Sequence, residues 1–556
     1  MRGTALCRCL LAVSALLVLS PAMAAQQQTV CTVTINSADE QQTFRRFLPP
    51  DKYRFVELVE HNRPDWLAAA CQAKVACDVL VISGHHGEGS EGNVFFSDSL
   101  DRGEHLPIEE LERVSCSDSC PSLFAHLKEV YLFGCNTLNP QPQHTISGEI
   151  VRSLIREGKS ADDATRLARL LGQTRGESSR DRMRLLFKDV PVIYGFSSVA
   201  PLGPVAGSIL NRYFRGSGTG EIAKGRTSSS LLRQFSQHGL VAARGIGDGD
   251  PLAPLRRDVC TFADDRLSVA QRLDEVHELL QRPAAQSRLL LDRIERFTAK
   301  LDASQRQQPE VAAALQRIAH DDAARERYLR FARDADEFPT RARMIEVARG
   351  LEWLTAQQRR EELVHMVGEL LARKDISAPN VDLACSVNKD GELDGALGRL
   401  ASGGFAADVS HAAVLACVGS DEARARVLEG LVSSDDNDVR IAQAYLRERP
   451  IVDVGELRRV TQAIARMSAP EAQTRALDVL ARHYVDDRES VDTLKHLFSR
   501  TRSQAVQNAI AGVLIRADRG SMKGSDLLPT LRENRLRASP AGNMVDALIE
   551  RLEKSS

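Results

Sequence analysis

The stretch DVLVISGHHGEG, residues 78–89, joins an apolar run to two adjacent histidines that glycines bracket. The apolar run is continuous rather than alternating, which is typical of a strand buried on both faces of a largely parallel α/β sheet. The carboxyl end of such a strand opens into the crevice where α/β sheets place their sites. The stretch therefore predicts a buried strand that brings His85 and His86 to a functional site.

A second apolar stretch, EVYLFGCNT, spans residues 129–137 and contains Gly134-Cys135 directly after the apolar run. If the two strands are neighbours in one sheet, a histidine and a cysteine face each other across the same edge. An imidazole in reach of a thiol favours the thiolate and can protonate a leaving amine. The two stretches together predict a nucleophile and its base.

The first half of the chain alternates short strand-like runs with helical patterns, which predicts a three-layer α/β domain. The strand-like runs are Val30–Ile35, Tyr53–Val59, Asp78–Ile82, Val130–Phe133 and Pro191–Tyr194. The helical patterns are Asp65–Lys74, Ser147–Arg156, Ala161–Leu171 and Pro204–Phe214.

The His86-Gly87 pair and the FGCNT block at 133–137 resemble the caspase-like clan of cysteine peptidases. This clan includes caspases, legumains, gingipains, separase and the bacterial CHAT proteins. In it, one apolar strand ends in His-Gly and a later strand ends in the nucleophilic cysteine; here 49 residues separate His86 from Cys135. The resemblance spans roughly residues 31–214 and implies a caspase-like peptidase domain over 25–258.

By this resemblance, His86 is the general base, Cys135 is the nucleophile, and the backbone N–H groups of Gly87 and Cys135 form the oxyanion hole. A glycine suits position 87 because a backbone donor must approach the tetrahedral intermediate without a Cβ in the way. The resemblance also implies that Ser197 and Ser198 line the pocket for the residue before the scissile bond. The implied function is a cysteine endopeptidase acting on protein or peptide substrates, with no cofactor and no metal ion.

Other interpretations of these residues stay open. Cys135 could be a buried structural cysteine or a disulfide partner, and His85 could replace His86 as the base. A zinc site of His85, His86 and Cys135 is conceivable, although adjacent histidines are poor ligands for one ion. Many clan members carry an acidic, Gln-Ala or Ser-Ala pair where this chain has Phe133-Gly134. The alternative function is therefore a catalytically inactive scaffold that binds protein partners.

The second half of the chain, over 259–556, nearly lacks strand signals and shows apolar residues at helical spacing, which predicts an all-helical domain. A unit recurs late in it: with Val439, Thr474 and Val506 as equivalents, the spacings are 35 and 32 residues. Such periods are typical of helical-hairpin solenoids, and the helix start beside Val439 resembles HEAT-type repeats. The resemblance implies a surface for a substrate or a protein partner, with an irregular helical bundle as the alternative.

Composition and the N-terminus predict the compartment. The chain has 556 residues and a formal net charge of −2, so no basic excess indicates a nucleic-acid binder. Arg2 and Arg8, the apolar run that follows and the cleavage motif Ala22-Met23-Ala24 predict a secretory signal peptide over 1–24. We therefore expect a mature chain without a membrane span that is periplasmic or secreted.

The cysteine count agrees with an unpaired thiol. Of 11 cysteines, cleavage after Ala24 removes two and leaves nine, so at least one stays free or pairs between molecules. If Cys135 is the free one, the other eight can form up to four bridges. Sequence does not fix their connectivity: local loops are possible for Cys71 with Cys77 and Cys116 with Cys120, while Cys385 and Cys417 both lie in the helical half.

Overall fold

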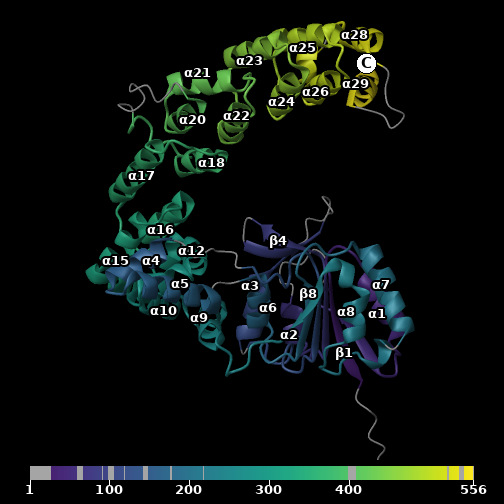
Figure 1. Cartoon of the computed structure of the whole chain (residues 1–556), viewed down its shortest axis with the longest axis vertical. Helices are drawn as coiled ribbons and strands as arrows, with labels where there is room; N and C mark the ends of the chain where they lie inside the picture. Colours follow the sequence, from purple (N-terminus) through teal and green to yellow (C-terminus); the bar gives the residue numbers. More distant parts are fainter. Residues whose placement is uncertain are drawn as a thin grey trace, which may run out of the picture. The chain divides into compact units, whose positions relative to one another are not determined.

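The computed structural model divides the chain into two compact units (Figure 1), an α/β unit of Met1–Thr145 with Arg169–Ser268 and a helical unit of Ile146–Ala168 with Val269–Ser556. The predicted signal peptide, residues 1–24, lies outside the residues that the structure describes. The described residues are 27–58, 67–89, 92–97, 105–117, 119–141, 148–175, 178–216, 218–397, 408–522, 525–536 and 544–554.

The α/β unit is built on a six-stranded sheet of order β2-β1-β3-β7-β8-β9. Its first five strands pair in parallel, and β9 joins β8 antiparallel. The predicted α/β class is confirmed, and the two motif-bearing strands β3 and β7 are neighbours, which meets the condition for His86 and Cys135 to share one edge. The sequence pattern does not predict β9, which is only four residues long and mostly half-buried. The strands are β1 (Gln28–Thr34), β2 (Tyr53–Glu57), β3 (Val79–Ser83), β7 (Glu129–Phe133), β8 (Val192–Phe196) and β9 (Leu240–Ala243).

Helices cover both faces of this sheet, because the central strands are apolar on both sides. Leu80 and Ile82 point into one core with α2, α3 and α6, while Val79 and Val81 point into the other with α1, α7 and α8 (Figure 1). The helices are α1 (Asp39–Phe47), α2 (Ala68–Gln72), α3 (Ile108–Cys116), α6 (Ser179–Leu186), α7 (Gly203–Arg215), α8 (Ser229–Gln234) and α9 (Ala253–Ala263), with short 3-10 turns at Gly218–Gly220 and Ser236–His238.

A second, three-stranded antiparallel sheet follows directly after the carboxyl end of β3. Its strands are β4 (His85–Gly89), β5 (Gly92–Phe96) and β6 (His105–Pro107), and α3 follows at once. The histidine pair therefore lies on a strand of its own. That strand starts two residues after β3 ends at Ser83.

Eight cysteines form four disulfides, and Cys135 is the free cysteine among the described residues. Neither of the two possible local loops forms, because Cys71, Cys77, Cys116 and Cys120 each pair with a cysteine that is distant in the sequence. Within the helical unit, Cys385 pairs with Cys417. The bridges are compatible with an extracellular or periplasmic location. They are Cys31–Cys77, Cys71–Cys120, Cys116–Cys260 and Cys385–Cys417.

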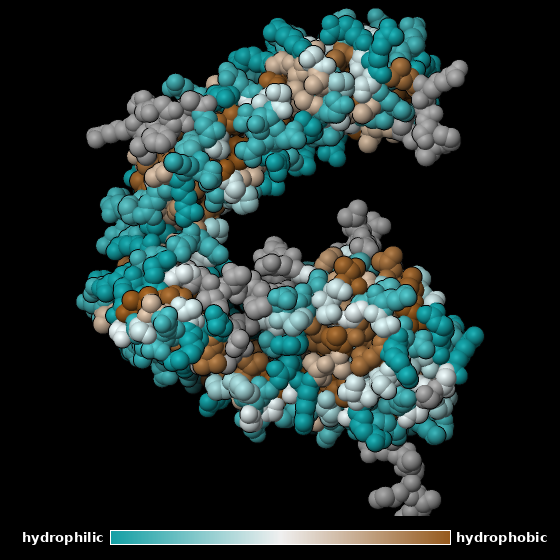
Figure 2. All heavy atoms as spheres, in the orientation of Figure 1, coloured by the Kyte–Doolittle hydropathy of each residue, from teal (hydrophilic) through white to brown (hydrophobic). Residues whose placement is uncertain are grey.

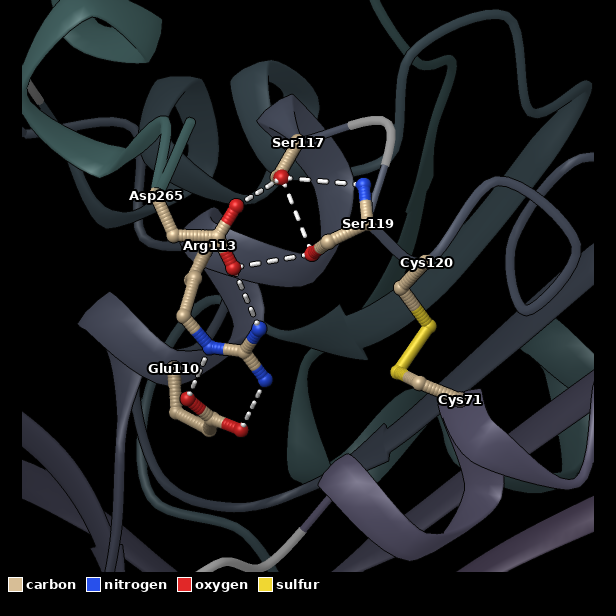
Figure 3. Close-up of a disulfide and its surroundings, with 7 residues drawn as sticks. All are labelled: Cys71, Glu110, Arg113, Ser117, Ser119, Cys120 and Asp265. Carbon is tan, nitrogen blue, oxygen red and sulfur yellow. Dashed lines mark hydrogen bonds and ion pairs between the residues drawn. A yellow bond between two sulfur atoms is a disulfide. The ribbon is translucent and has the colours of Figure 1, made fainter. Parts of the chain in front are cut away.

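Close to the Cys71–Cys120 bridge, a cluster of polar contacts joins α3 to the segment after α9 (Figure 3). Asp265, just after α9, accepts hydrogen bonds from Ser117 and Ser119 and pairs with Arg113 at 3.1 Å. Arg113 is held in turn by Glu110 at 2.7 Å. The Cys116–Cys260 bridge joins the same two segments, so the end of the α/β unit is fixed to α3 both covalently and by charge.

The helical unit consists of helices alone in its described residues. It includes α4, from the segment between β7 and β8, which contacts α11 and forms an Arg152–Asp336 ion pair of 2.9 Å. No helix in the described chain is long and apolar enough to cross a membrane. The helices are α4 (Gly148–Arg156), α5 (Ala161–Arg175), α10 (Val269–Gln281), α11 (Ala284–Arg288), α12 (Leu291–Ala299), α13 (Ala303–Arg306), α14 (Pro309–Ala319), α15 (Asp322–Arg333), α16 (Phe338–Gly350), α17 (Ala356–Leu371), α18 (Ala378–Val387), α20 (Val409–Cys417), α21 (Asp421–Gly430), α22 (Asp436–Glu448), α23 (Val454–Arg466), α24 (Pro470–Leu480), α25 (Arg488–Arg500), α26 (Gln504–Leu514), α27 (Arg519–Met522), α28 (Leu527–Asn534) and α29 (Met544–Glu553).

The late helices stack in two rows, α22, α24 and α26 in one and α23, α25 and α28 in the other (Figure 1). Buried Gln473 and Gln507 each donate to the carbonyl nine residues earlier, at 2.8 and 3.3 Å. Asp453 and Asp487 each cap the helix that follows them. Both pairs are 34 residues apart, so the equivalence of Thr474 with Val506 is wrong in register although the repeating helices are real.

Replacing Gln473 should destabilise the helical unit more than replacing its neighbour. Gln473→Ala removes the buried side-chain donor to the Ile464 and Met467 carbonyls, for an expected cost of about 1–2 kcal/mol. Thr474→Ala removes only a bond to Pro470 within its own helix and should change the unfolding free energy by less than about 0.5 kcal/mol. Urea unfolding followed by circular dichroism measures both, and equal losses would contradict the 34-residue register.

Candidate functional site

The segments that contain His86 and Cys135 follow two neighbouring strands of the sheet, β3 and β7. In the parallel pairing of β3 with β7, Ser83 lies opposite Phe133. The Gly84 N–H then donates to the Phe133 carbonyl at 3.1 Å. His86 and Cys135 follow these residues by three and two positions, so both come off neighbouring strands at one carboxyl edge.

A direct hydrogen bond joins His86 to Cys135. The Nδ1 atom of the ring lies 2.9 Å from the backbone carbonyl oxygen of Cys135. The His86 side chain is 7% exposed and packs against Phe95, with ring centroids 4.9 Å apart. A Cβ on Gly134 would lie 2.8 Å from the Cβ of His86 and 2.9 Å from the Gly84 carbonyl. Only glycine therefore allows the two segments to approach this closely.

Burial decides the protonation of His86. Loss of hydration lowers the pKa of its imidazole to about 4, the bond to the Cys135 carbonyl opposes this shift, and the charge of Arg182 adds to it. The ring is thus neutral at pH 7. A carbonyl oxygen can only accept, so the proton sits on Nδ1 and Nε2 carries a lone pair. Within the described residues, this buried Nε2 has no hydrogen-bond partner.

Cys135 is half-buried, and its sulfur receives a backbone donor. The Ala200 N–H donates to Cys135 Sγ at 3.4 Å. The next residue, Asn136, has a left-handed backbone with φ of 56° and donates its N–H to the Ser198 carbonyl at 2.8 Å. The turn after β7 is thereby fixed to the segment after β8.

Thr137 holds this turn against the end of β8. Its hydroxyl donates to the Gly134 carbonyl at 3.1 Å and accepts the Phe196 N–H at 3.0 Å. The side chain is fully buried. Through these two bonds Thr137 ties the residues on either side of Cys135 to the end of β8.

His85 and Gly87 flank the buried histidine. His85 is turned to another partner, since its Nε2 lies 2.9 Å from the Asn36 amide nitrogen. Around Gly87 the fold leaves space: a Cβ there would meet only the Phe96 ring, at 3.7 Å. Packing therefore does not require a glycine at position 87. No group of three histidine, cysteine or carboxylate side chains suited to a metal ion occurs among the described residues.

Glu40 is a titratable group at this edge that the sequence did not single out. It lies in the first turn of α1, is 3% exposed, and has Ser83 and Ser37 close by. Burial raises the pKa of its carboxyl to about 7, its own backbone N–H opposes the shift and the charge of Asp39 adds to it. An acidic residue at a helix start is common, so nothing in the sequence marks it.

Comparison with known protein families, curated proteins and solved structures finds no match for this chain. The functional argument therefore depends on the site geometry and on the motif resemblance.

The depressed pKa of His86 predicts an acid-sensitive fold. The unfolded ring takes up a proton near its ordinary pKa of 6.5, whereas the folded ring resists protonation down to about 4. Stability relative to His86→Asn, which keeps a donor for the Cys135 carbonyl, should therefore fall by up to about 3 kcal/mol between pH 7 and pH 4. Urea unfolding of both proteins across this range measures the difference, and parallel pH curves would contradict a neutral buried ring.

Removing the Thr137 hydroxyl should loosen the turn. Thr137→Val strands the Phe196 N–H without its acceptor and takes a donor from the Gly134 carbonyl, for an expected cost of about 2–5 kcal/mol. Thr137→Ser keeps both bonds and should cost about 1 kcal/mol for the lost methyl group. Thermal unfolding compares the two variants; similar losses would show that packing, not the hydroxyl, holds the turn.

Proposed function

We propose that the chain is a secreted cysteine endopeptidase of the caspase-like type, with Cys135 as nucleophile and His86 as general base. The observation that carries this proposal is the bond between His86 Nδ1 and the carbonyl of the free Cys135, which leaves the lone pair of Nε2 without a hydrogen-bond partner among the described residues. A buried basic nitrogen without a partner costs free energy, so a fold that keeps one at a sheet edge favours a chemical role.

The chemistry proceeds in two steps. Cys135 Sγ attacks the carbonyl carbon of the scissile bond while His86 Nε2 takes the thiol proton and passes it to the leaving amine. The product is a thioester and a free amine. Water, deprotonated by the same Nε2, then attacks the thioester, and the proton returns to sulfur as the acid is released.

Backbone donors stabilise the oxyanion in both steps. In this proposal they are the N–H groups of Gly87 and Cys135. The open space around Gly87 supports this role, because the fold has no packing need for glycine there. The close packing at Gly134 gives a structural reason for the glycine of the Phe133-Gly134 pair, so that glycine does not argue for an inactive scaffold.

We also propose that the helical repeats, HEAT-like in their hairpin stacking, bind a substrate or a protein partner. Between α22 and α24 they form a hollow of about 540 Å³. Its charged lining residues are Asp436, Arg440, Arg475, Asp478 and Arg482. A polar hollow suits a protein surface better than a small apolar ligand. The four disulfides support a periplasmic or secreted site of action.

Covalent labelling tests the dyad. A peptide vinyl sulfone should modify the purified protein at Cys135 at pH 7 with the disulfides intact, as mapped by mass spectrometry. His86→Asn retains the donor to the Cys135 carbonyl but lacks Nε2, so labelling should slow by about 10²–10⁴-fold. His85→Asn is the matched control and should react like the wild type.

Two results would count against the enzyme. One is a Cys135 that takes up no peptide reagent although iodoacetamide reaches it; the other is equal labelling of His86→Asn and wild type. Either result would favour a scaffold that binds partners without catalysis. Cleavage of an unfolded protein such as β-casein, lost in Cys135→Ala, would complete the positive case.

A further inference from the structure

Exposed apolar side chains of the α/β unit gather beside the candidate site. The large apolar residues exposed on its described part are Phe96, Leu170, Val199, Leu202 and Val205. All but Leu170 lie in two segments that border the site, which are β5 and residues 199–205. Figure 2 shows apolar surface where α7 begins. Grouped exposure of this kind marks a binding surface, whereas scattered single residues do not.

One of these segments neighbours the histidine strand, and the other neighbours Cys135. Phe96 on β5 is 37% exposed, stands next to Gly87, and has its ring 5.4 Å from that of His85. Val199 is 72% exposed and directly precedes Ala200, whose N–H reaches the sulfur of Cys135. Leu202, two residues further along, is 67% exposed.

The backbone beside the thiol is also open. The N–H and the carbonyl of Val199 have no hydrogen-bond partner among the described residues, while Ser198 and Ala200 on either side each make one bond to the Cys135 turn. Unpaired peptide groups between exposed apolar side chains suit an extended peptide, which offers both kinds of contact. A lipid surface would leave the Val199 backbone groups unpaired, at a cost.

We propose that this surface, formed by Phe96, Val199, Leu202 and Val205, binds substrate side chains next to the scissile bond, and that these side chains are large and apolar. The inference rests on the proposed function and adds the substrate class to it. Burying one leucine-sized side chain is worth about 1.5–3 kcal/mol, which corresponds to about 10–150-fold in rate or affinity. The preferred substrates are therefore polypeptides with Leu, Ile, Val, Met or Phe near the cut bond.

Cleavage-site mapping tests this substrate class. The full-length protein is incubated with a library of proteome-derived peptides, and cuts absent with Cys135→Ala are mapped by mass spectrometry. Large apolar residues should be enriched within three positions of the cut. For the best substrate, changing its apolar residue to serine should lower kcat/KM by about tenfold or more.

Surface variants then assign the preference to the proposed residues. Val199→Asp and Leu202→Asp should reduce the leucine-over-serine preference to near one, and the rate at which iodoacetamide modifies Cys135 shows whether the new charge itself changes the thiol. Val199→Ser and Leu202→Ser repeat the test without a new charge. Val452→Asp is the matched control, because Val452 is 85% exposed in the helical unit and should not affect the preference.

The outcomes separate this inference from the proposed function. Cys135-dependent cleavage without apolar enrichment, or with enrichment that Leu202→Asp leaves unchanged, overturns the substrate class and leaves the peptidase standing. Absence of any Cys135-dependent cleavage overturns both. Self-association of the wild type that Leu202→Asp abolishes, with the preference intact, assigns the surface to a second copy of the chain and also overturns the inference.

Discussion

The carbonyl oxygen of Cys135 holds the ring of His86, and the rest of the site depends on that one hydrogen bond. It fixes the tautomer, because an acceptor on one side of the ring leaves the lone pair on the other. It also makes the two halves of the site a single unit, since the backbone of Cys135 orients the His86 ring. A shift of either strand end would move both groups together.

Such a bond forms only if the backbones come very close, and Gly134 is what permits this. The parallel register of β3 with β7 sets the two chain segments beside each other, and Thr137 fixes the second one to β8. Three neighbouring strands thus contribute to one small turn.

The sequence predicts the elements of this site better than its contacts. Continuous apolar runs are a strong signal for buried strands, so β3, β7 and the meeting of His86 with Cys135 follow from them. The donor to the thiol comes from the Ala200 backbone, and a backbone N–H has no sequence signature. Glu40 has no sequence signal either, because the largest cause of its raised pKa is burial in the folded chain.

Other features that the sequence does not predict also depend on contacts made only in the folded chain. Disulfide partners such as Cys116 and Cys260 are 144 residues apart and meet only in the folded chain. In the helical repeats, the equivalent buried position is a glutamine rather than an apolar residue. An alignment of the triplets at 473–475 and 505–507 matches Thr474 with Val506, and so it places Gln473 and Gln507 at different positions of the repeat.

The placement of α4 has a consequence for biosynthesis. It is translated between β7 and β8, yet its Arg152 bonds to the carbonyl of Asp334, 182 residues later. As the chain leaves the ribosome, β8 and β9 can complete the sheet long before α4 meets the helices that bury its Ile150 and Leu154. A nascent chain that stops after the sheet would expose this helix to proteases and chaperones. The completed helical unit thus protects a segment that begins only 13 residues after the cysteine nucleophile proposed here.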